Sequence, residues 1–512
     1  MSSRRAALCL IATLAGTAAW AQDAGAPPLS VIDWLDSQSP TPAALPGPTE
    51  PDVATSATVP EVSVLPLDGA APRRVGLAPS AVTGLPDTLW AGTGGQRLAR
   101  QIAQMPDLRL PALQSLFYTL LLAEALPPST GADVFDLARV RALLDLGALD
   151  PAQALLDQAG VDTTPAHFAL SMDVALLVGN TASACAIAQA QPRLSPGTAH
   201  DVYCAARAGN WDTASLLLGT GRVLELVTEA ETAALERFLD PDLFEDDPAR
   251  ASPDTPDPLL FRLYEAIGTP IPTRGLPVVY ANADLSDTAG WKTQIEAAER
   301  LARTGALPDN RLLGLYTQRR PAASGGVWDR VAALQRFETA LGTGSPAAVS
   351  KTLPAAWRTM RGAQLSVPFA NLFADRLAQM ILSGATADIA FEVLLLSPQY
   401  ETAAQVFPAR ALRRPVLAAV AAGDVPATLT ADGQAGAVLA AFRDAPPDPK
   451  IIDTAQTGAL GHALLDALAL THAGGAGDVA RLTTGLATLR ALGLEDVARR
   501  TALQVLVLEQ RG

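Results

Sequence analysis

Apolar residues between positions 133 and 222 recur at helical spacing, in runs that are interrupted by a glycine and a few polar residues. In Asp150–Ala159, for example, Ala152, Leu156 and Ala159 fall on one helical face by the i, i+4, i+7 rule. The pattern predicts three successive pairs of antiparallel helices. We therefore expect an all-α fold.

The three predicted hairpin turns share one composition, in which a glycine ends an apolar run and an alanine follows five residues later. The turns are Gly147-Ala-Leu-Asp-Pro-Ala152, Gly179-Asn-Thr-Ala-Ser-Ala184 and Gly209-Asn-Trp-Asp-Thr-Ala214, spaced 32 and 30 residues apart. Glycine lets a helix end in the left-handed conformation, and Asp150 or Asp212 can cap the helix that follows. The small alanine lets the two helices pack closely.

These turns resemble those of the tetratricopeptide family, whose repeat of about 34 residues uses a similar glycine, aromatic and alanine set. The turn containing Trp211 matches best, but the family's full pattern of tryptophan, tyrosine and terminal proline is absent. The resemblance implies a TPR-like solenoid of helical hairpins with an extended concave groove, the kind of surface that binds peptides or proteins.

The hairpin pattern resumes at Trp291 and continues to the end of the sequence. The turn glycines are placed at Gly305, Gly342, Gly384, Gly423, Gly458 and Gly493, with an alanine five residues later at Ala347, Ala463 and Ala498. The final apolar run, Asp496–Leu508, is predicted to pack on the array as a closing helix. We thus expect two helical-repeat blocks, 75–239 and 291–512.

Residues 240–290, between the two blocks, are acidic and rich in proline. Such a charged run is typical of a solvated connector, with one short helix predicted at 259–267. A calcium-binding loop in the acidic, proline-rich run 239–258 is the alternative.

The first 21 residues have the features of a signal peptide. Arg4 and Arg5 precede the apolar run Ala6–Ala15, and a small-x-small site predicts cleavage between Ala21 and Gln22. An uncleaved anchor is the alternative, although the run is shorter than the roughly 20 residues that cross a bilayer. The arginine pair half-matches a twin-arginine signal, so both export routes stay open. We expect a periplasmic protein without a transmembrane segment in the mature chain.

Residues 22–74 are rich in proline, alanine, threonine and serine and lack helical periodicity, which predicts a disordered arm. Within the arm, Val31–Leu35 forms an apolar island, in which Ile32, Trp34 and Leu35 stand next to acidic residues. An apolar island on such an arm is typical of a docking peptide. Docking on its own chain, docking on a partner and accidental composition all remain open.

Segment 75–90 contains prolines and a glycine that are incompatible with a regular helix, so it is predicted to be an extended lead-in. Helices are expected to follow at 96–105 and 110–126.

The predicted mature chain contains two cysteines, Cys185 and Cys204. If the predicted helices 182–190 and 198–208 run antiparallel, the cysteines are offset by three residues, or roughly 4.5 Å of helical rise. We expect a disulfide in an oxidising compartment, and a pair of small buried thiols is the alternative. A metal site is not expected, because His200 is the only nearby histidine and no Cys-x-x-Cys spacing occurs.

The formal net charge is -14, and removal of the two leader arginines makes it -16. Because the chain is this acidic, we do not expect it to bind nucleic acid or anionic membranes. The basic residues are almost all arginine, with lysine only at Lys292, Lys351 and Lys450. We interpret this bias as the composition of a GC-rich genome.

A search for catalytic signatures finds no zinc-protease, nucleophile-elbow, phosphate-loop or paired-cysteine motif. His167 and His462 lie within predicted helices and are interpreted as structural, and Glu225 and Glu229 have ordinary helix-surface spacing. We therefore predict no catalytic, cofactor-binding or metal-binding residues, no cofactor, and no enzymatic activity.

The pattern favours a non-enzymatic periplasmic scaffold that binds a protein or peptide in its helical groove. The alternative is a cell-wall associated protein related to the superhelical part of soluble lytic transglycosylases. No segment outside the predicted array is large enough for the catalytic domain of those enzymes.

The leader, the 31–35 island, Thr83–Trp90 and the Arg320–Asp329 loop are similar to an uncharacterised family of secreted, alanine-rich bacterial proteins. Some members carry the label antifreeze glycopeptide-related. That label implies Ala-Ala-Thr tandem repeats or a flat threonine array, and this sequence has neither. Ice binding is therefore a remote alternative.

Overall fold

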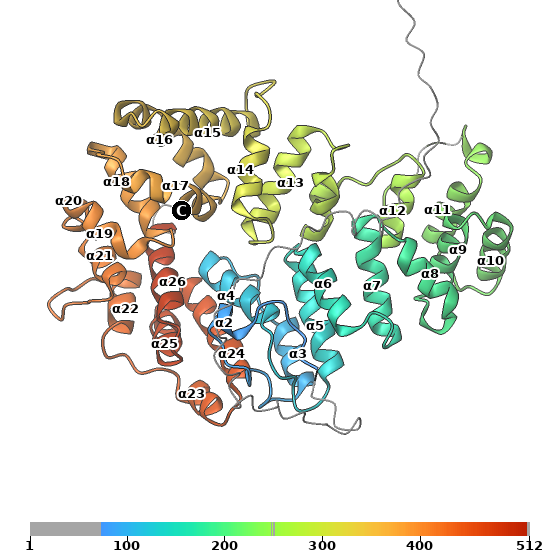
Figure 1. Cartoon of the computed structure of the whole chain (residues 1–512), viewed down its shortest axis with the longest axis horizontal. Helices are drawn as coiled ribbons and strands as arrows, with labels where there is room; N and C mark the ends of the chain where they lie inside the picture. Colours follow the sequence, from blue (N-terminus) through green and yellow to red (C-terminus); the bar gives the residue numbers. More distant parts are fainter. Residues whose placement is uncertain (1–72, 247, 249–250, 509–512) are drawn as a thin grey trace, which may run out of the picture. The chain divides into compact units, whose positions relative to one another are not determined.

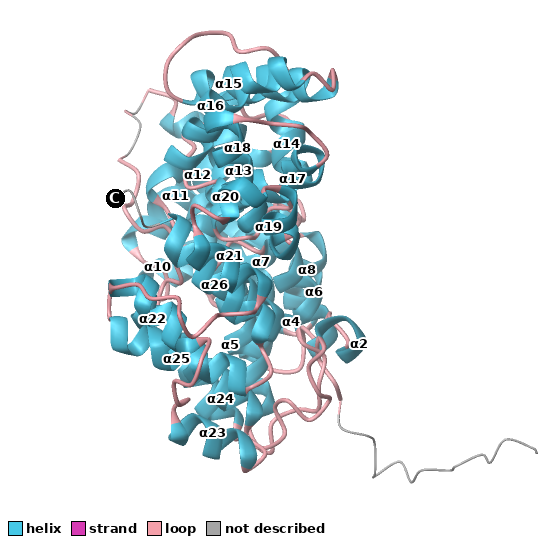
Figure 2. Cartoon of the chain, turned by 90° about the vertical axis from the view of Figure 1, so that its left-hand side faces the viewer, coloured by secondary structure: helices cyan, strands magenta, loops and turns pink. Residues whose placement is uncertain are grey.

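Helices account for nearly all regular structure in the part of the chain that the structure describes (Figure 2). The computed structural model describes residues 73–246, 248 and 251–508, in which the only β pairing consists of two isolated bridges. The predicted all-α fold is confirmed. The predicted leader with its cleavage site at Ala21 and Gln22, and the docking residues Ile32, Trp34 and Leu35, lie outside the described residues.

The described residues from 73 to 508 belong to one compact unit, which contains the helices of both predicted repeat blocks. Its first half comprises α2 (Ser80–Thr83), α3 (Gly95–Ala103), α4 (Pro111–Leu122), α5 (Ala132–Asp145), α6 (Leu149–Ala159), α7 (Pro165–Val178), α8 (Ala182–Ala190), η2 (Pro192–Leu194), α9 (Thr198–Arg207), α10 (Trp211–Val223), α11 (Glu229–Leu239), η3 (Asp242–Phe244) and α12 (Pro258–Ala266).

The second half begins with two 3-10 helices. It continues as α-helices, which are drawn from yellow-green to red in Figure 1. It comprises η4 (Thr273–Gly275), η5 (Val278–Leu285), α13 (Trp291–Arg303), α14 (Asp309–Thr317), α15 (Val327–Gly342), α16 (Pro346–Gly362), α17 (Ser366–Ala378), α18 (Gly384–Leu395), η6 (Tyr400–Thr402), α19 (Ala403–Val406), α20 (Pro408–Ala411), α21 (Pro415–Ala422), α22 (Gly433–Ala441), α23 (Pro449–Gln456), α24 (Leu460–Gly475), α25 (Val479–Ala491) and α26 (Glu495–Leu508).

The predicted hairpin turns occur in the structure, with two corrections. Seven of the nine predicted turn glycines follow a helix with positive φ, as the left-handed cap requires: Gly147, Gly179, Gly209, Gly305, Gly423, Gly458 and Gly493. Gly342 is instead the last residue of α15, and Gly344 is the left-handed residue of that turn. Gly384 begins α18 rather than ending a helix.

The alanine that follows the turn glycine by five residues is small because it is buried between helices. Five of the six alanines that follow a predicted turn glycine by five residues are buried: Ala152, Ala184, Ala214, Ala463 and Ala498. Ala347 is exposed, because the turn is displaced by two residues. Val349, five residues after the true turn glycine Gly344, is fully buried in its place.

The last helices of the unit pack against its first helices, so the array closes on itself. Helix α24 contacts α3 and α4, and α26 contacts α4 (Figure 1). The backbone N–H of Gly461 donates to the carbonyl of Leu89 over 3.0 Å, and that of Ala112 donates to the Gln504 side chain over 2.9 Å. A Cβ on Gly461 would lie 2.3 Å from the Trp90 ring, so only glycine permits this approach.

A second contact joins the middle of the chain to the first hairpin. The Thr304 hydroxyl donates to the carbonyl of Leu146 over 2.6 Å, and the Asn282 amide donates to that of Gly147 over 2.9 Å. Both carbonyls belong to the turn between α5 and α6, which the η5–α13 segment therefore covers. With the contacts of α26 on α4 and on α18, this makes a closed circuit of helices.

Arginines from one helix bind the carbonyls at the C-terminal end of another, where the last turn leaves four backbone acceptors unpaired. They are Arg139 at the end of α4, Arg262 at α7, Arg303 at α16, Arg361 at α26, Arg490 at α22 and Arg499 at α21. A guanidinium offers five donors in a planar fork, whereas a lysine offers a single ammonium. Six of the arginines thus have a structural role that composition alone does not reveal.

Candidate functional site

A connected set of hollows, which we call the central cavity, lies where α4, α13, α16 and α26 meet. Its middle part has a volume of about 670 Å³ and is lined by Arg109, Arg300, Arg303, Arg361 and Gln364, among others. It shares Arg361 with a neighbouring hollow of about 960 Å³, and Arg303 and Gln364 with one of about 240 Å³. The walls come from segments that are up to 400 residues apart in the sequence.

The middle part of the central cavity is lined by more arginines than carboxylates, although Arg303 lies 3.3 Å from Glu299 and Arg361 lies 3.6 Å from Glu392. Four arginines line it, and Asp107 is the only acidic residue in its wall. Burial lowers the pKa of Arg300, Asp284 raises it, and the nearby positive charge of Arg303 lowers it further. The two guanidinium groups therefore repel each other within a chain whose formal charge is -14.

Backbone carbonyls hold three of these arginines in place: Arg300, Arg303 and Arg361, the last through the carbonyl of Val507. Arg300 donates to Thr273 over 2.8 Å and to Leu276 over 2.7 Å, which fixes the segment before η5. Arg303 donates to Ala363 over 2.8 Å, at the end of α16. These hydrogen bonds use part of each guanidinium and fix the positive charges in the wall.

Two arginines and one amide of the wall make no side-chain hydrogen bond or ion pair with the described residues. Arg109 precedes α4, and Arg358 lies on α16 in the neighbouring hollow; both are exposed. Gln364 sits in the turn from α16 to α17 with a φ of 60°, an uncommon conformation for a residue other than glycine. These side chains are the ones with donors available for a ligand.

One side of the neighbouring hollow carries acidic residues that are already paired. Glu392 lies 2.7 Å from Arg414 and 3.6 Å from Arg361. Asp388 lies 2.7 Å from Arg410. These ion pairs neutralise the acidic side and leave the excess positive charge on the side of Arg109 and Arg358.

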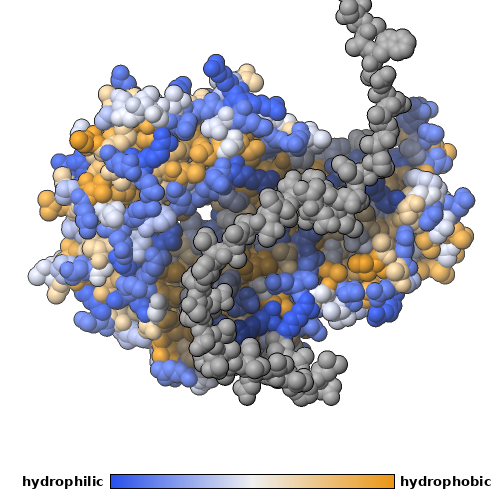
Figure 3. All heavy atoms as spheres, viewed as in Figure 1, coloured by the Kyte–Doolittle hydropathy of each residue, from blue (hydrophilic) through white to orange (hydrophobic). Residues whose placement is uncertain are grey.

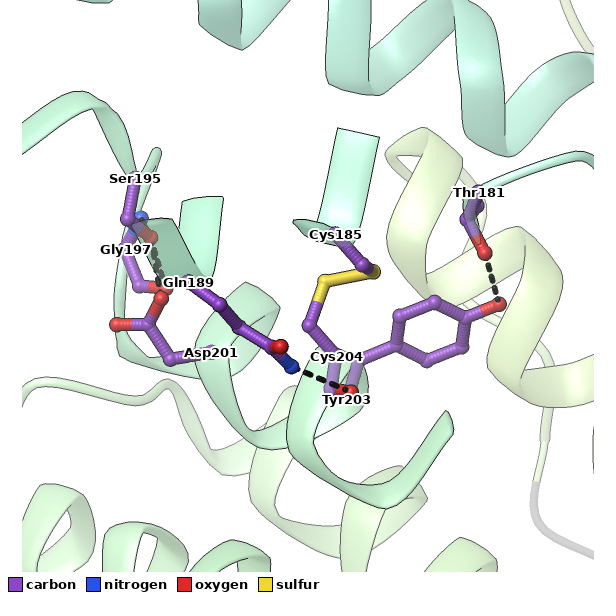
Figure 4. The surroundings of a disulfide bond; sticks show 8 residues. All are labelled: Thr181, Cys185, Gln189, Ser195, Gly197, Asp201, Tyr203 and Cys204. Atoms are coloured by element: carbon purple, nitrogen blue, oxygen red, sulfur yellow. Dashed lines mark hydrogen bonds between the residues drawn. A yellow bond between two sulfur atoms is a disulfide. The ribbon is translucent and has the colours of Figure 1, made fainter. Parts of the chain in front are cut away.

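The predicted disulfide is present. Cys185 on α8 and Cys204 on α9 are bonded, with their Cα atoms 5.2 Å apart (Figure 4). The Gln189 amide donates to the carbonyl of Cys204 over 3.3 Å, and the Thr181 and Tyr203 hydroxyls lie 3.5 Å apart (Figure 4). The bond joins the last helix of one hairpin to the first helix of the next, and neither cysteine lines the central cavity.

The two histidines that were interpreted as structural have protein partners. The His167 ring lies 2.8 Å from the Thr164 hydroxyl, in the first turn of α7, and His462 contacts Gln101 across the α3–α24 interface. Burial lowers the pKa of both rings.

In the described ranges, no group of three or more histidine, cysteine, aspartate or glutamate side chains is arranged so that it could hold a metal ion. The acidic run 239–258, in which a calcium-binding loop was the alternative, is described only in part.

A second hollow, which we call the α3–α5 groove, lies between two helices that begin side by side. The N–H of Gly95 donates to the carbonyl of Thr130 over 2.6 Å, just before α5. The groove has a volume of about 450 Å³ and is lined along its length by Ala99, Ala103, Ala138 and Ala142, among others. It shares no residue with the central cavity.

Exposed hydrophobic side chains gather on α10 and just after it: Trp211, Leu216, Val223, Leu224 and Leu226. Figure 3 shows hydrophobic surface at the end of the unit where Figure 1 places α8 to α10. None of the described helices is long and apolar enough to cross a bilayer.

The sequence analysis missed the central cavity. Its only local signal is the i, i+3 spacing of Arg300 with Arg303 and of Arg358 with Arg361 near the ends of α13 and α16. That spacing is common on exposed helix surfaces, so it does not identify a site.

Comparison with protein-family models, with curated proteins and with solved structures found no match to this chain.

Proposed function

We propose that this chain is an exported, non-enzymatic interaction protein that binds an acidic segment of a partner protein in its central cavity. The observation that carries the proposal is the excess of arginine over acidic residues in the cavity wall of an acidic chain. A guanidinium binds a carboxylate through two parallel hydrogen bonds, and such charge-assisted bonds are roughly twice as strong as neutral ones.

The net charge of the chain is negative, whereas arginines outnumber carboxylates in the cavity wall. This difference in charge favours specific binding in the cavity. A net charge of -14 repels an acidic peptide from most of the surface, so binding depends on the local field of Arg109, Arg358 and their neighbours. Surface charges that are farther than about 8 Å from the ligand are largely screened at physiological salt. The local arginines therefore dominate the interaction.

The closed circuit of helices supports a preformed site. The hydrogen bonds of Arg300 and Arg303 fix the cavity wall before any ligand enters. A wall that is already ordered loses little conformational entropy on binding. This favours a binding protein in which the helices supply a rigid frame.

Export is proposed from the predicted leader and is supported by the disulfide. A bond between Cys185 and Cys204 persists in oxidising compartments such as the periplasm, and is rare where thiols are kept reduced. The proposed location also supplies the partners: exported proteins or their acidic segments.

The proposal is tested by calorimetric titration of the full mature chain with a synthetic decaglutamate peptide and with decaglutamine as the neutral control. We expect decaglutamate to bind and the double variant Arg109→Glu, Arg358→Glu to raise its Kd at least roughly tenfold, because a charge-assisted hydrogen bond contributes about 1.5 to 3 kcal/mol. Arg320→Glu, at an exposed position outside the cavity, is the matched control. Equal binding by the double variant, or equal binding of decaglutamine, contradicts the proposal.

The cell-wall alternative stays a prediction and can be tested with the same variants. Peptide stems of peptidoglycan also carry carboxylates, so purified sacculi form a separate arm of the experiment. Co-sedimentation with sacculi that Arg109→Glu, Arg358→Glu abolishes, without binding of decaglutamate, would favour the cell wall over a protein partner. Ice binding stays a remote alternative, and a thermal-hysteresis assay tests it.

A further inference from the structure

The smallest of the three hollows of the central cavity, which we call the side hollow, has a volume of about 240 Å³. Its walls come from the turn between α13 and α14, from the start of α14, and from parts of α4, α17 and α26. Helix α26 packs on α4, and α14 packs on α17. Pockets for drug-sized ligands have volumes of about 300 to 1,000 Å³. The side hollow is therefore sized for a smaller group of atoms.

The side hollow contains a carboxylate without a cationic partner. Asp309, the first residue of α14, lines the hollow and makes no ion pair with the described residues. One of its oxygens accepts a 2.8 Å hydrogen bond from the Asn371 amide on α17, and the other has no partner among the described residues. Burial raises the pKa of Asp309, and the bond from Asn371 lowers it. The negative charge is thus partly withdrawn from water and not neutralised.

Two arginines also line the side hollow, but each has an acidic partner. Arg303 lies 3.3 Å from Glu299, and Arg500 lies 3.7 Å from Asp496. The Nε atom of Arg500 is buried and donates no hydrogen bond within the described ranges. Among the charged groups of this wall, the carboxylate on α14 is therefore the one that lacks a counter-ion in the described part of the chain.

Gln504 of α26 supplies a second donor without a partner. Its side chain is 1% exposed, and its Oε1 atom accepts a 2.9 Å hydrogen bond from the backbone N–H of Ala112. Its Nε2 atom donates to none of the described residues, and the hydroxyl of the half-buried Tyr118 is equally unpaired there. Buried polar groups are normally hydrogen-bonded, so these groups indicate a polar occupant of the side hollow.

We propose that the side hollow binds a protonated α-amino group together with the carbonyl or carboxylate group next to it. The ammonium group donates to Asp309, and the adjoining oxygen accepts from Gln504 and from Nε of Arg500. Such charge-assisted hydrogen bonds are shorter and stronger than neutral ones. Three buried apolar side chains complete the wall and keep water from these contacts: Leu307, Val367 and Pro368.

The charges of the wall distinguish this ligand from other small polar molecules. An isolated carboxylate is repelled by Asp309, and a neutral sugar leaves the charge of Asp309 without a counter-ion. In the described ranges, no group of three acidic, histidine or cysteine side chains could hold a metal ion. An ammonium group has three donors and no acceptor, which suits the free oxygen of Asp309. A ligand that carries this group beside an oxygen acceptor satisfies both sides of the wall.

Two sources offer this chemistry: a free amino acid and the amino terminus of a peptide. The side hollow shares Arg303 and Gln364 with the middle part of the central cavity. A peptide whose first residue lies in the side hollow can therefore continue into the middle part, and capture of a terminal amine is a recurring mode of peptide recognition. The proposal does not rest on the binding of an acidic segment, because the ammonium group contacts a carboxylate rather than the arginines.

The experiment is a ligand-observed NMR titration of the full mature chain with trialanine amide. Acetyl-trialanine amide, which lacks the ammonium group, is the matched control on the unchanged protein. We expect saturable binding of trialanine amide and at least about tenfold weaker binding of the acetylated peptide, because charge-assisted hydrogen bonds are roughly twice as strong as neutral ones. The isosteric Asp309→Asn is expected to raise the Kd of trialanine amide by a similar factor. Asp212→Asn, in the first turn of α10 and outside the hollow, should leave that Kd unchanged.

A titration with L-alanine distinguishes the two sources. Tighter binding of trialanine amide than of L-alanine assigns the amino terminus of a peptide, whereas L-alanine that binds as tightly or more tightly assigns a free amino acid. Equal binding of the acetylated peptide, an unchanged Kd in Asp309→Asn, or no saturable binding of either free amine overturns the proposal. Trialanine amide carries no carboxylate, so its titration and that of decaglutamate succeed or fail separately.

Discussion

The guanidinium of Arg361, on α16, donates a 2.8 Å hydrogen bond to the backbone carbonyl of Val507, in the last turn of α26. The two residues are 146 positions apart, and the bond caps a helix that also packs on α4. Arg361 lines the central cavity as well. One side chain therefore helps to close the array and contributes positive charge to the proposed binding site.

Replacement of a capping arginine by lysine is expected to destabilise the fold. Arg139 is 1% exposed and donates to the carbonyls of Leu121, Ala123 and Val75. Lysine cannot reach all three, and each buried acceptor left unpaired costs about 1 to 3 kcal/mol. We expect Arg139→Lys to lower the free energy of unfolding by about 2 to 4 kcal/mol in urea titrations. The exposed control Arg320→Lys should change it by less than about 0.5 kcal/mol, and equal effects would contradict the capping role.

The closure of the array is expected to depend on Gly461. A Cβ there would lie 2.3 Å from the Trp90 ring, so Gly461→Ala forces the first and last helices apart and should cost about 1 to 3 kcal/mol. Gly219, inside α10, has open space around its Cα, and Gly219→Ala should stabilise by about 0.5 to 1 kcal/mol. Thermal unfolding followed by circular dichroism measures both. A stabilising Gly461→Ala would mean that the two ends do not pack as described.

Loss of the disulfide is expected to weaken the packing of α8 against α9. The bond closes a sequence separation of 19 residues, which corresponds to about 3 kcal/mol in the loop-entropy model. Hydrogen exchange should accelerate in α8 and α9 of Cys185→Ser, Cys204→Ser and remain unchanged in α24. Reducing agent should reproduce this pattern in the wild-type chain and have no further effect on the variant. Uniform acceleration across all helices would argue against a local role.

Asp173 is expected to make the free energy of unfolding depend on pH. Burial and, to a smaller extent, the charge of Asp257 raise its pKa to about 6, and the charge of Arg141 opposes this shift. The folded chain therefore binds this proton more tightly than the unfolded chain does, so the group stabilises the fold at low pH. That stability is lost as pH rises from about 4 through about 6. At pH 7.5, the free energy of unfolding of Asp173→Asn should be about 1 to 3 kcal/mol higher than that of the wild-type chain. This difference should vanish near pH 4. A constant difference at both pH values would contradict the assignment.

The hairpins could be predicted because their signals are local. A turn glycine such as Gly209 and a buried alanine such as Ala214 lie five residues apart, within the range that helical periodicity reports. The disulfide was predictable for the same reason, because Cys185 and Cys204 lie on consecutive helices only 19 residues apart. The shifted turn at Gly344 was missed because two glycines stand close together and the pattern fits either.

The closure and the central cavity could not be predicted because their contacts are distant in sequence. Nothing near Gly461 indicates that Trp90 packs on it, and nothing near Arg303 indicates the carbonyl of Ala363. The arginine bias was interpreted as a property of the genome. Its structural role becomes visible only when helix ends from different hairpins are brought together.

The most direct test of the central claim is photo-crosslinking from the cavity in the exporting cell. Benzoylphenylalanine replaces Gln364, in the wall of the central cavity, and as a control replaces Ala347, which is exposed and does not line it. We predict one discrete adduct from position 364 that maps by mass spectrometry to an acidic segment of another exported protein and disappears in Arg109→Glu, Arg358→Glu. The same adduct from both positions, an adduct that survives the charge reversal, or no adduct from position 364 would contradict the claim.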